Sequence, residues 1–410
     1  MAGQTNQMRI LYITPYVPSL IRVRPYNLLG SLAQRGHQIT LLSISGSAQE
    51  EKDADQLTEW CQRVETISVS RMRSLWNCVK ALPQPWFPLQ AVYSFSPRMQ
   101  KGIQTLLKEE PFDIVHVEHL RGAHFGTAVA GVPKVYDSVD CISLLFEKAL
   151  HSAPGLASRL IAWLDLGRTR RYESRLVSQY DKVLVTSPQD KEALLKLDGR
   201  SHGQDQEKKI TVLPNGVDLE YFTFANGDRA PETLVFSGKM SYHANIAAVS
   251  HLAREVMPLI WARRPEVKLE IVGKNPPQAI CALARDDRVC ITGFVPDLRL
   301  YLARATVSVS PMQYSVGIQN KVLEAMAMGT PVVASSQACS ALKVRNGTHL
   351  LVADEPTTFA EWVLRLLDDV ALRQEIAVNG RNYVEERHDW RAIAHNLENI
   401  YAEVMDTWEN

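Results

Sequence analysis

The sequence predicts an α/β protein made of two Rossmann-like, doubly wound domains. Apolar, strand-like runs alternate with amphipathic helical stretches from residue 9 to residue 187, and the same alternation begins again at residue 233. A polar segment over residues 199–209 separates the two series and is typical of a surface loop. We therefore predict an N-terminal domain over residues 1–205 and a C-terminal domain over residues 206–389.

The N-terminal domain is predicted to begin with a β-loop-α-β unit. It consists of a strand at Arg9–Tyr16, a helix at Pro25–Arg35 closed by Gly36, and a strand at Gln38–Ile44. The loop after the first strand contains no glycine, so the dinucleotide-binding fingerprint is absent and an oxidoreductase is disfavoured. Further elements are predicted at Val64–Ser70, Pro97–Glu109 (a helix), Asp113–His119, Lys134–Asp140 and Lys182–Ser187.

The C-terminal domain repeats the alternation, so we expect a cleft between the two domains at the carboxyl ends of their strands. Its strands are predicted at Leu234–Ser237, Lys268–Val272, Val289–Phe294, Val307–Pro311 and Pro331–Ala334. Its helices are predicted at Ala244–Ala262, Pro277–Ala284, Leu298–Arg304 and Ile318–Met328. After Pro356 the chain is predicted to be helical, with a break at Arg387–Asp389 and a last helix at Trp390–Glu409.

Composition narrows the classes of function. Lys plus Arg equal Asp plus Glu at 45 each, so no overall positive field favours nucleic acid as a partner. The six cysteines lack C-x-x-C spacing, which indicates reduced thiols rather than a zinc site or a disulfide framework. Neither a signal peptide nor an apolar run of membrane-spanning length is evident, so we expect a cytoplasmic protein.

The stretch Ser315–Ser335 is the most informative part of the chain. A short loop with Gly317 leads into the predicted helix, whose unpaired N-terminal amides and dipole favour an anion. Lys321 and Glu324 are three residues apart and share a helical face. One offers a cation for a phosphate, and the other offers a carboxylate for a ribose hydroxyl pair. The alternative is that both are solvated surface charges.

Within this stretch, residues Leu323–Val333 resemble the nucleotide-sugar-binding signature of the retaining glycosyltransferases of family 4, which have the GT-B fold. The segment G-I-Q-N-K-V-L-E-A-M-A-M-G is similar to the sequences of the bacterial exopolysaccharide branch of that family. Supporting segments are L-P-N-G-V-D-L-E-Y-F from Leu213, V-F-S-G-K-M-S-Y-H-A-N from Val235 and T-G-F-V-P-D-L-R-L-Y-L from Thr292. The resemblance implies two domains facing across a cleft, with a C-terminal helix over residues 390–410 packing back on the first domain.

The resemblance also implies a donor site. Two family cations bind the diphosphate; Lys239, after Gly238, stands at the first position, whereas Ala244 stands at the second, and Lys321 can compensate. Of two family glutamates, Glu324 matches the one that holds the ribose, and Val316 replaces the other. The backbone amides of Gly317, Ile318, Gln319 and Asn320 are further candidates for binding the diphosphate. The side chains of Gln319 and Asn320 can hold hydroxyls of the donor sugar.

In the N-terminal domain the family places a histidine near the transferred sugar. We assign this role to His119 and interpret His116 as a core histidine. Asp137 and Asp140 either orient the acceptor hydroxyl or cap the following helix. In the first loop, Arg22 and Arg24 either meet an anionic group of the acceptor or are solvated.

The segment Gly155–Ser178 has apolar residues at helical spacing followed by arginines. Such a helix can lie on an anionic bilayer, or its apolar stripe can pack on its own domain, which we favour. The apolar residues are Leu156, Leu160, Trp163 and Leu164, and the basic ones are Arg168, Arg170, Arg171 and Arg175.

The resemblance implies a retaining hexosyltransferase that uses a nucleoside-diphosphate sugar, and we expect a saccharide acceptor that is linked to a lipid. The donor site contains no D-x-D pair, so we expect neither a metal nor another cofactor. Two alternatives remain. One is a nucleotide-sugar epimerase on the same fold, and the other is a degenerate carbohydrate-binding protein without activity.

Overall fold

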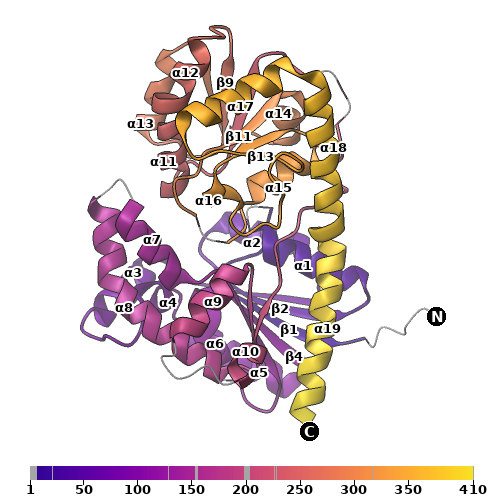
Figure 1. Cartoon of the computed structure of the whole chain (residues 1–410). Helices are drawn as coiled ribbons and strands as arrows, with labels where there is room; N and C mark the ends of the chain where they lie inside the picture. Colours follow the sequence, from indigo (N-terminus) through magenta and orange to yellow (C-terminus); the bar gives the residue numbers. More distant parts are fainter. Residues whose placement is uncertain are drawn as a thin grey trace, which may run out of the picture. The chain divides into compact units, whose positions relative to one another are not determined.

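The structure is a computed structural model that describes residues 7–20, 22–127, 129–152, 156–197, 204–225, 227, 229–315 and 317–409. The chain forms two compact α/β units, coloured along the sequence in Figure 1. Unit 1 comprises Met1–Glu147, Leu160–Pro214 and Trp390–Asn410, and unit 2 comprises Lys148–Arg159 and Asn215–Asp389. Val316, at which the family places a glutamate, lies outside the described residues.

Unit 1 contains a parallel seven-stranded sheet in the order β3-β2-β1-β4-β5-β6-β7. The central strands are apolar and buried, as expected for a parallel sheet covered on both faces. Its strands are β1 (Arg9–Thr14), β2 (Gln38–Ser45), β3 (Arg63–Ser68), β4 (Ile114–Glu118), β5 (Lys134–Val139), β6 (Lys182–Val185) and β7 (Ile210–Val212).

The short strand β7 is absent from the sequence prediction, which assigned its residues to the second domain. It spans only three residues and is recognisable through its parallel pairing with β6. Unit 1 therefore continues to Pro214, past the expected boundary at residue 205.

The helices of unit 1 connect these strands (Figure 1). The first of them, α1, begins earlier than predicted and takes in Arg24, which we had placed in a loop. The helices are α1 (Val23–Gln34), α2 (Ala48–Gln56), α3 (Arg71–Ala81), α4 (Leu89–Tyr93), α5 (Pro97–Glu109), α6 (His119–Gly126), α7 (Ile142–Ser152), α8 (Leu156–Gln179), α9 (Pro188–Leu197) and α10 (Gln204–Lys209).

The last helix, α19 (Trp390–Glu409), belongs to unit 1 and is yellow in Figure 1. Leu397 and Tyr401 on this helix are fully buried in a hydrophobic core with Tyr12 of β1 and Leu28 of α1. The predicted return of the C-terminal helix to the first domain is confirmed.

Unit 2 contains a parallel six-stranded sheet in the order β10-β9-β8-β11-β12-β13. Its strands are β8 (Thr233–Ser237), β9 (Lys268–Val272), β10 (Val289–Gly293), β11 (Val307–Ser310), β12 (Val332–Ala334) and β13 (Leu351–Val352).

The helix predicted at Ala244–Ala262 is interrupted. A π-helical turn at Leu252–Val256 joins α11 (His243–His251) to α12 (Met257–Trp261), since Pro258 has no amide hydrogen with which to continue the α-helical pattern. The remaining helices are α13 (Gln278–Cys281), α14 (Arg299–Arg304), α15 (Asn320–Ala327), α16 (Ser336–Cys339), α17 (Pro356–Asp368) and α18 (Val370–Arg387).

Candidate functional site

The strand order of unit 2 reverses beside β8, which lies between β9 and β11. Connections from these strands leave on opposite faces, and the resulting crevice at the carboxyl ends is where doubly wound sheets bind ligands. The segment after β8 carries Gly238 and Lys239, and the segment after β11 leads into α15. Most of the predicted donor residues therefore lie at one edge of one sheet.

At this edge two backbone segments approach each other closely. The Gly238 N–H donates to the Val272 carbonyl over 3.0 Å. A Cβ atom on Gly273 would lie 1.7 Å from the Gly238 carbonyl oxygen. Only glycine fits at residue 273, and the two glycines keep this strand-end surface open for a ligand.

The Lys321 ammonium is enclosed by the ends of β8 and β11. Its Nζ donates to the Asn245 side-chain oxygen and lies 4.4 Å from the Phe236 ring centroid. It also lies 3.6 Å from the Met312 sulfur. A Cβ atom on Gly238 would come within 3.2 Å of this Nζ, so the cation lies over the glycine backbone.

Burial perturbs both charged groups of α15. It lowers the pKa of Lys321 to about 7, although the Glu324 carboxylate partly offsets this effect. Burial also raises the pKa of Glu324 to about 7, against the opposing effect of Lys321. Both side chains are half-buried rather than fully exposed, which favours the site assignment over that of two solvated surface charges.

The start of α15 differs slightly from the prediction. The helix begins at Asn320 rather than Ile318, and its N-cap residue Gln319 makes no side-chain capping hydrogen bond. Gly317 adopts a left-handed conformation with φ of 62°, and Ile318 is buried. The Val322 amide donates to the Gln319 carbonyl over 2.9 Å, while the Gln319 side chain does not cap the helix, and such a helix start is suited to an anion.

Lys239 is exposed at the same edge, and the Asn245 side-chain amide donates to its carbonyl over 2.9 Å. Ala244, which replaces the second family cation, is fully buried in α11. Asn245 therefore contacts both the Lys321 ammonium and the Lys239 backbone. The sequence did not single out Asn245, because its partner Lys321 is distant along the chain.

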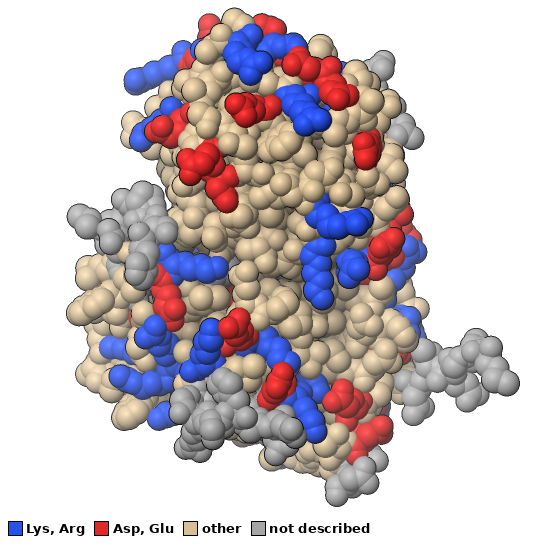
Figure 2. Space-filling model, viewed as in Figure 1, with Lys and Arg blue, Asp and Glu red and all other residues tan. Residues whose placement is uncertain are grey.

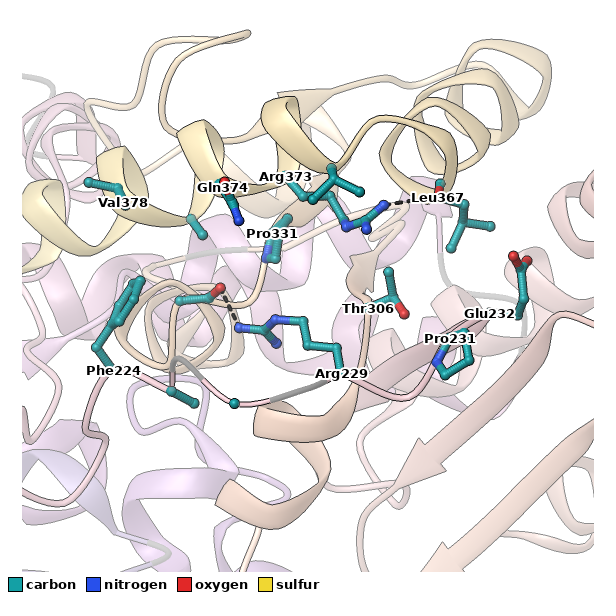
Figure 3. Close-up of a pocket in the computed structure, with 15 residues that line it drawn as sticks. Phe224, Arg229, Pro231, Glu232, Thr306, Pro331, Leu367, Arg373, Gln374 and Val378 are labelled. Atoms are coloured by element: carbon teal, nitrogen blue, oxygen red, sulfur yellow. Dashed lines mark hydrogen bonds between the residues drawn. The ribbon is translucent and has the colours of Figure 1, made fainter.

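A larger cavity of about 570 Å³ lies elsewhere in unit 2 (Figure 3). Glu232, Thr306 and Pro331 line it and precede β8, β11 and β12, so it lies at the amino edge of the sheet. Its Arg229 guanidinium donates to backbone carbonyls, including that of Gly329 over 2.6 Å. This cavity therefore lies at the opposite edge of the sheet from the predicted donor residues.

In unit 1, His119 follows directly after β4 and is the first residue of α6. Its φ is 64°, and its Nδ1 accepts from the Arg121 amide over 3.2 Å. Burial, with Arg121 and Arg22 nearby, lowers the pKa of His119 to about 3, so the imidazole is neutral. A neutral ring at a strand end suits contact with an uncharged sugar.

His116 is a core residue, as predicted. It is fully buried, stacks on Tyr12 at 4.2 Å between ring centroids, and its Nδ1 bonds the Tyr401 hydroxyl of α19 over 2.7 Å. Burial lowers the pKa of His116 to about 4. Burial next to Asp137 raises the pKa of the neighbouring Glu118 carboxyl to about 8.

Arg24 and Asp137 are buried and form an ion pair, with 2.7 Å between Nε and Oδ2. The pair lies within unit 1, between α1 and β5. Arg24 therefore lies in a helix rather than in the predicted loop, and its guanidinium is not solvated. Long-range strand pairing brings the two residues together, which sequence spacing does not reveal.

Asp140 and Asp137 do not hold the first amides of α7. The carboxylate of Glu173, from α8, accepts from the amides of Ile142 over 2.7 Å and Ser143 over 3.1 Å. Asp140 instead accepts from the Thr186 hydroxyl over 3.3 Å, and burial next to Asp190 raises the pKa of Asp140 to about 7. The helix cap thus comes from a residue that local sequence patterns could not identify.

The described residues contain no group of three or more His, Cys, Asp or Glu side chains placed to hold a metal ion. In the same part of the chain, no helix is both long and apolar enough to cross a membrane.

Two family models match the chain. Residues 22–221 match the model described as Glycosyltransferase Family 4, and residues 231–369 match Glycosyl transferases group 1. These matches cover most of both units.

Individual relatives are more distant. The chain is 22% identical over 413 residues to the phosphatidyl-myo-inositol mannosyltransferase of Mycobacterium leprae, covering 97% of each chain. It is also 22% identical over 228 residues to an uncharacterized 44.6 kDa protein in the cps region of Klebsiella pneumoniae, covering 53% of this chain and 58% of that one. Among solved structures, Anabaena HepE in complex with UDP and glucose has a TM-score of 0.69 at 16% identity, covering 97% of this chain and 100% of the other.

Two doubly wound parallel sheets, with a cationic site at the carboxyl edge of the second, define a glycosyltransferase of the GT-B fold. The chain belongs to glycosyltransferase family 4, in the group 1 glycosyl transferases. The family, fold and enzyme class expected from the sequence are confirmed. The comparisons give no support to a nucleotide-sugar epimerase.

Proposed function

We propose that this enzyme transfers a hexose, with retention and without a metal, from a nucleoside-diphosphate sugar to a lipid-linked saccharide. The observation that carries the donor assignment is the Lys321 ammonium, enclosed over Gly238 at the reversal point of the unit 2 sheet. A half-buried cation gains more from a ligand that brings negative charge than a fully solvated cation does.

Charge builds on the diphosphate as the glycosidic bond breaks, so groups that stabilise the leaving diphosphate dominate catalysis. We assign this role to Lys321, Lys239 and the amides of residues 317–320. Glu324 holds the ribose, while Gln319 and Asn320 contact the donor sugar. His119 lies near the transferred sugar in unit 1.

The named proteins support this reading of the substrates. HepE has been crystallised with UDP-glucose, and the mycobacterial relative is named for mannosyl transfer to a phosphatidyl-inositol. The Klebsiella relative, from a cps region, supports a place in exopolysaccharide biosynthesis.

A donor screen tests the proposed activity. We expect one class among UDP-, GDP- and dTDP-sugars to raise the melting temperature, because a ligand that binds only the native state stabilises it. With that donor and a lipid-linked acceptor, we expect an anomer-retaining product that still forms in excess chelator. Donor binding without turnover across an acceptor panel would indicate a degenerate binding protein.

The membrane side of the proposal rests on an exposed apolar surface of unit 1, which we call the α3–α8 surface. Trp163 is 67% exposed, Met72 66% and Trp76 59%, so their apolar areas face solvent. Of the predicted α8 stripe, Leu160, Trp163 and Leu164 thus face solvent, contrary to our expectation, whereas the Leu156 side chain lies outside the described residues. The surface consists of Met72, Leu75, Trp76, Val79, Leu82, Trp86, Phe87, Leu160, Trp163 and Leu164.

The two helices of this surface are linked by contacts. Arg168 of α8 donates to the Leu82 carbonyl, and Arg175 lies 4.9 Å from the Trp86 ring centroid. Between Glu65 and Glu109 the sequence contains no acidic residue, and Figure 2 shows basic side chains over this part of unit 1. Exposed tryptophans with surrounding arginines complement an anionic bilayer.

Vesicle flotation tests this surface. We expect the enzyme to float with vesicles of phosphatidylglycerol and phosphatidylcholine, and to bind pure phosphatidylcholine at least several-fold more weakly, since each basic group near an anionic surface contributes about 1 kcal/mol. The Trp76→Glu, Trp163→Glu double variant should lose flotation. The control is Leu300→Glu, because Leu300 is 65% exposed in unit 2. Equal flotation of all three proteins would contradict the assignment.

A further inference from the structure

Unit 1 contains a cavity of about 220 Å³ at the carboxyl ends of β1, β2 and β3. Tyr16 follows β1, Gly46 follows β2, and Val69 follows β3. The cavity is smaller than a typical pocket for a whole ligand, which is roughly 300–1,000 Å³. Its size therefore suits one chemical group of a larger substrate.

Three arginines line this cavity: Arg22, Arg71 and Arg121. No ion pair among the described residues involves any of the three. The Glu50 carboxylate also lines the cavity and accepts from the Gly46 amide over 2.7 Å. The cavity therefore has an excess of positive charge.

Two of these guanidinium groups make cation–π contacts with tyrosine rings. Arg22 lies 4.2 Å from the Tyr16 ring centroid, and Arg121 lies 5.5 Å from that of Tyr93. Such stacking leaves the planar N–H groups available for an oxygen-rich anion. The cations are thus positioned in advance of binding.

The Arg121 guanidinium lacks a hydrogen bond to the described residues at one of its nitrogen atoms. Its Nε atom is buried and makes no hydrogen bond to any described residue. Burial and the nearby Arg22 guanidinium lower the pKa of Arg121. A half-buried guanidinium whose buried Nε bonds no described residue is partly desolvated, and an anion between Arg121 and Arg22 would offset the cost of that desolvation.

The cavity adjoins the candidate transfer site. The Arg121 amide donates to His119 Nδ1, and the Tyr16 ring centroid lies 5.9 Å from that of His119. It also adjoins the α3–α8 surface, because Arg71 and Ser74 of the cavity belong to the same helix as Trp76. An anionic group bound here would lie near both His119 and the first turn of α3.

We propose that this arginine cavity binds a phosphate group of the acceptor. Convergent guanidinium groups together with hydroxyl side chains match the charge and the several acceptor oxygens of a phosphate ester. Ser74 and Ser94, each 4% exposed, supply such hydroxyls. This inference rests on the proposed transferase function and specifies its acceptor as phosphorylated.

The test compares two arginines on the same helix. Arg71 lines the cavity, whereas Arg73 is exposed two residues later and does not line it. Binding is measured by calorimetry with glycerol 3-phosphate, and with dodecyl phosphate in dodecyl maltoside micelles. We expect Arg71→Ala and Arg121→Met to weaken binding roughly tenfold or more, and Arg73→Ala to leave it within about twofold.

The two probes separate the sources of the phosphate. Tighter binding of the micellar phosphate indicates a lipid phosphate, and equal binding indicates a soluble phosphorylated saccharide. Equal weakening by Arg71→Ala and Arg73→Ala, or no binding of either probe, would overturn the inference. If the inference fails but the enzyme transfers sugar to a neutral saccharide, the proposed transferase function still holds. If the cavity binds phosphate but no donor supports transfer, the proposed function is wrong and the phosphate site is not.

Discussion

Replacing Lys321 with methionine should lower kcat/KM by roughly 100- to 1,000-fold, the usual cost of losing one group that stabilises a developing negative charge. The fold should survive, because the substitution removes an ammonium whose burial already lowers its pKa to about 7. We expect an unchanged or higher melting temperature together with weaker donor binding by calorimetry. Glu324→Ala should also weaken donor binding, through the ribose.

The matched control for this variant is Lys268→Met. Lys268 is exposed at the first residue of β9, at the opposite edge of the same sheet. Its replacement should leave both donor affinity and turnover unchanged. Donor affinity that stays at the wild-type value in both Lys321→Met and Glu324→Ala would show that the nucleotide binds elsewhere.

The same pair makes donor binding dependent on pH. A bound diphosphate favours the protonated form of Lys321, whose pKa is about 7 in the free enzyme. Ribose hydroxyls that donate to Glu324 favour its ionised form instead, so the measurement is made in the Glu324→Gln variant, in which only Lys321 of this pair titrates. Binding should therefore take up protons just above pH 7, and donor affinity should fall as the pH rises through that range. Calorimetry in two buffers of different ionisation enthalpy measures this uptake. Proton release would have the wrong sign.

The second large effect concerns stability. Asp137→Ala should lower the free energy of unfolding by about 3–5 kcal/mol, because it leaves the Arg24 guanidinium buried without its carboxylate. The side chains of the pair are 4% and 0% exposed. Urea unfolding can be followed by tryptophan fluorescence, which reports mainly on unit 1 through Trp60, Trp76, Trp86, Trp163, Trp390 and Trp408.

Two further variants serve as controls for the Asp137→Ala measurement. Glu192→Ala breaks an exposed pair, with Glu192 and Lys196 both about two-thirds exposed, and should leave the free energy of unfolding nearly unchanged, because solvent screens such pairs. The double variant Arg24→Met, Asp137→Leu should recover much of the loss, since it leaves no charge unpaired. Wild-type stability with lost transfer in Asp137→Ala would instead point to contact between Asp137 and the acceptor.

Local signals predicted many elements well. The bounds of α5, β9 and α19 agree with the prediction, since α5 has Ser96 before Pro97, β9 follows Pro265, and α19 is strongly amphipathic. Periodicity failed for β7, which is too short, and for the π-helical turn before Met257. It also revealed the apolar stripe of α8 but not that the stripe faces solvent, because coverage depends on neighbouring elements.

The sequence likewise predicted some residues of the candidate site and missed others. Lys321 and Glu324 are neighbours on one helix, so their spacing sufficed to predict a shared face. Asn245, which binds the Lys321 ammonium, and Glu173, which caps α7, are brought in by tertiary packing. Arg22 was noted as a possible anion contact, but its grouping with Arg71 and Arg121 required the folded sheet.

The place of α19 in the core of unit 1 affects how the chain folds during synthesis. A nascent chain that has emerged only to Asp389 contains every residue of unit 2 but lacks Tyr401, the hydrogen-bonding partner of the His116 ring. The core of unit 1, in which Tyr12 and Leu28 pack with α19, can therefore be completed only after all of unit 2 has been synthesised, which reverses the usual order in which N-terminal domains finish first.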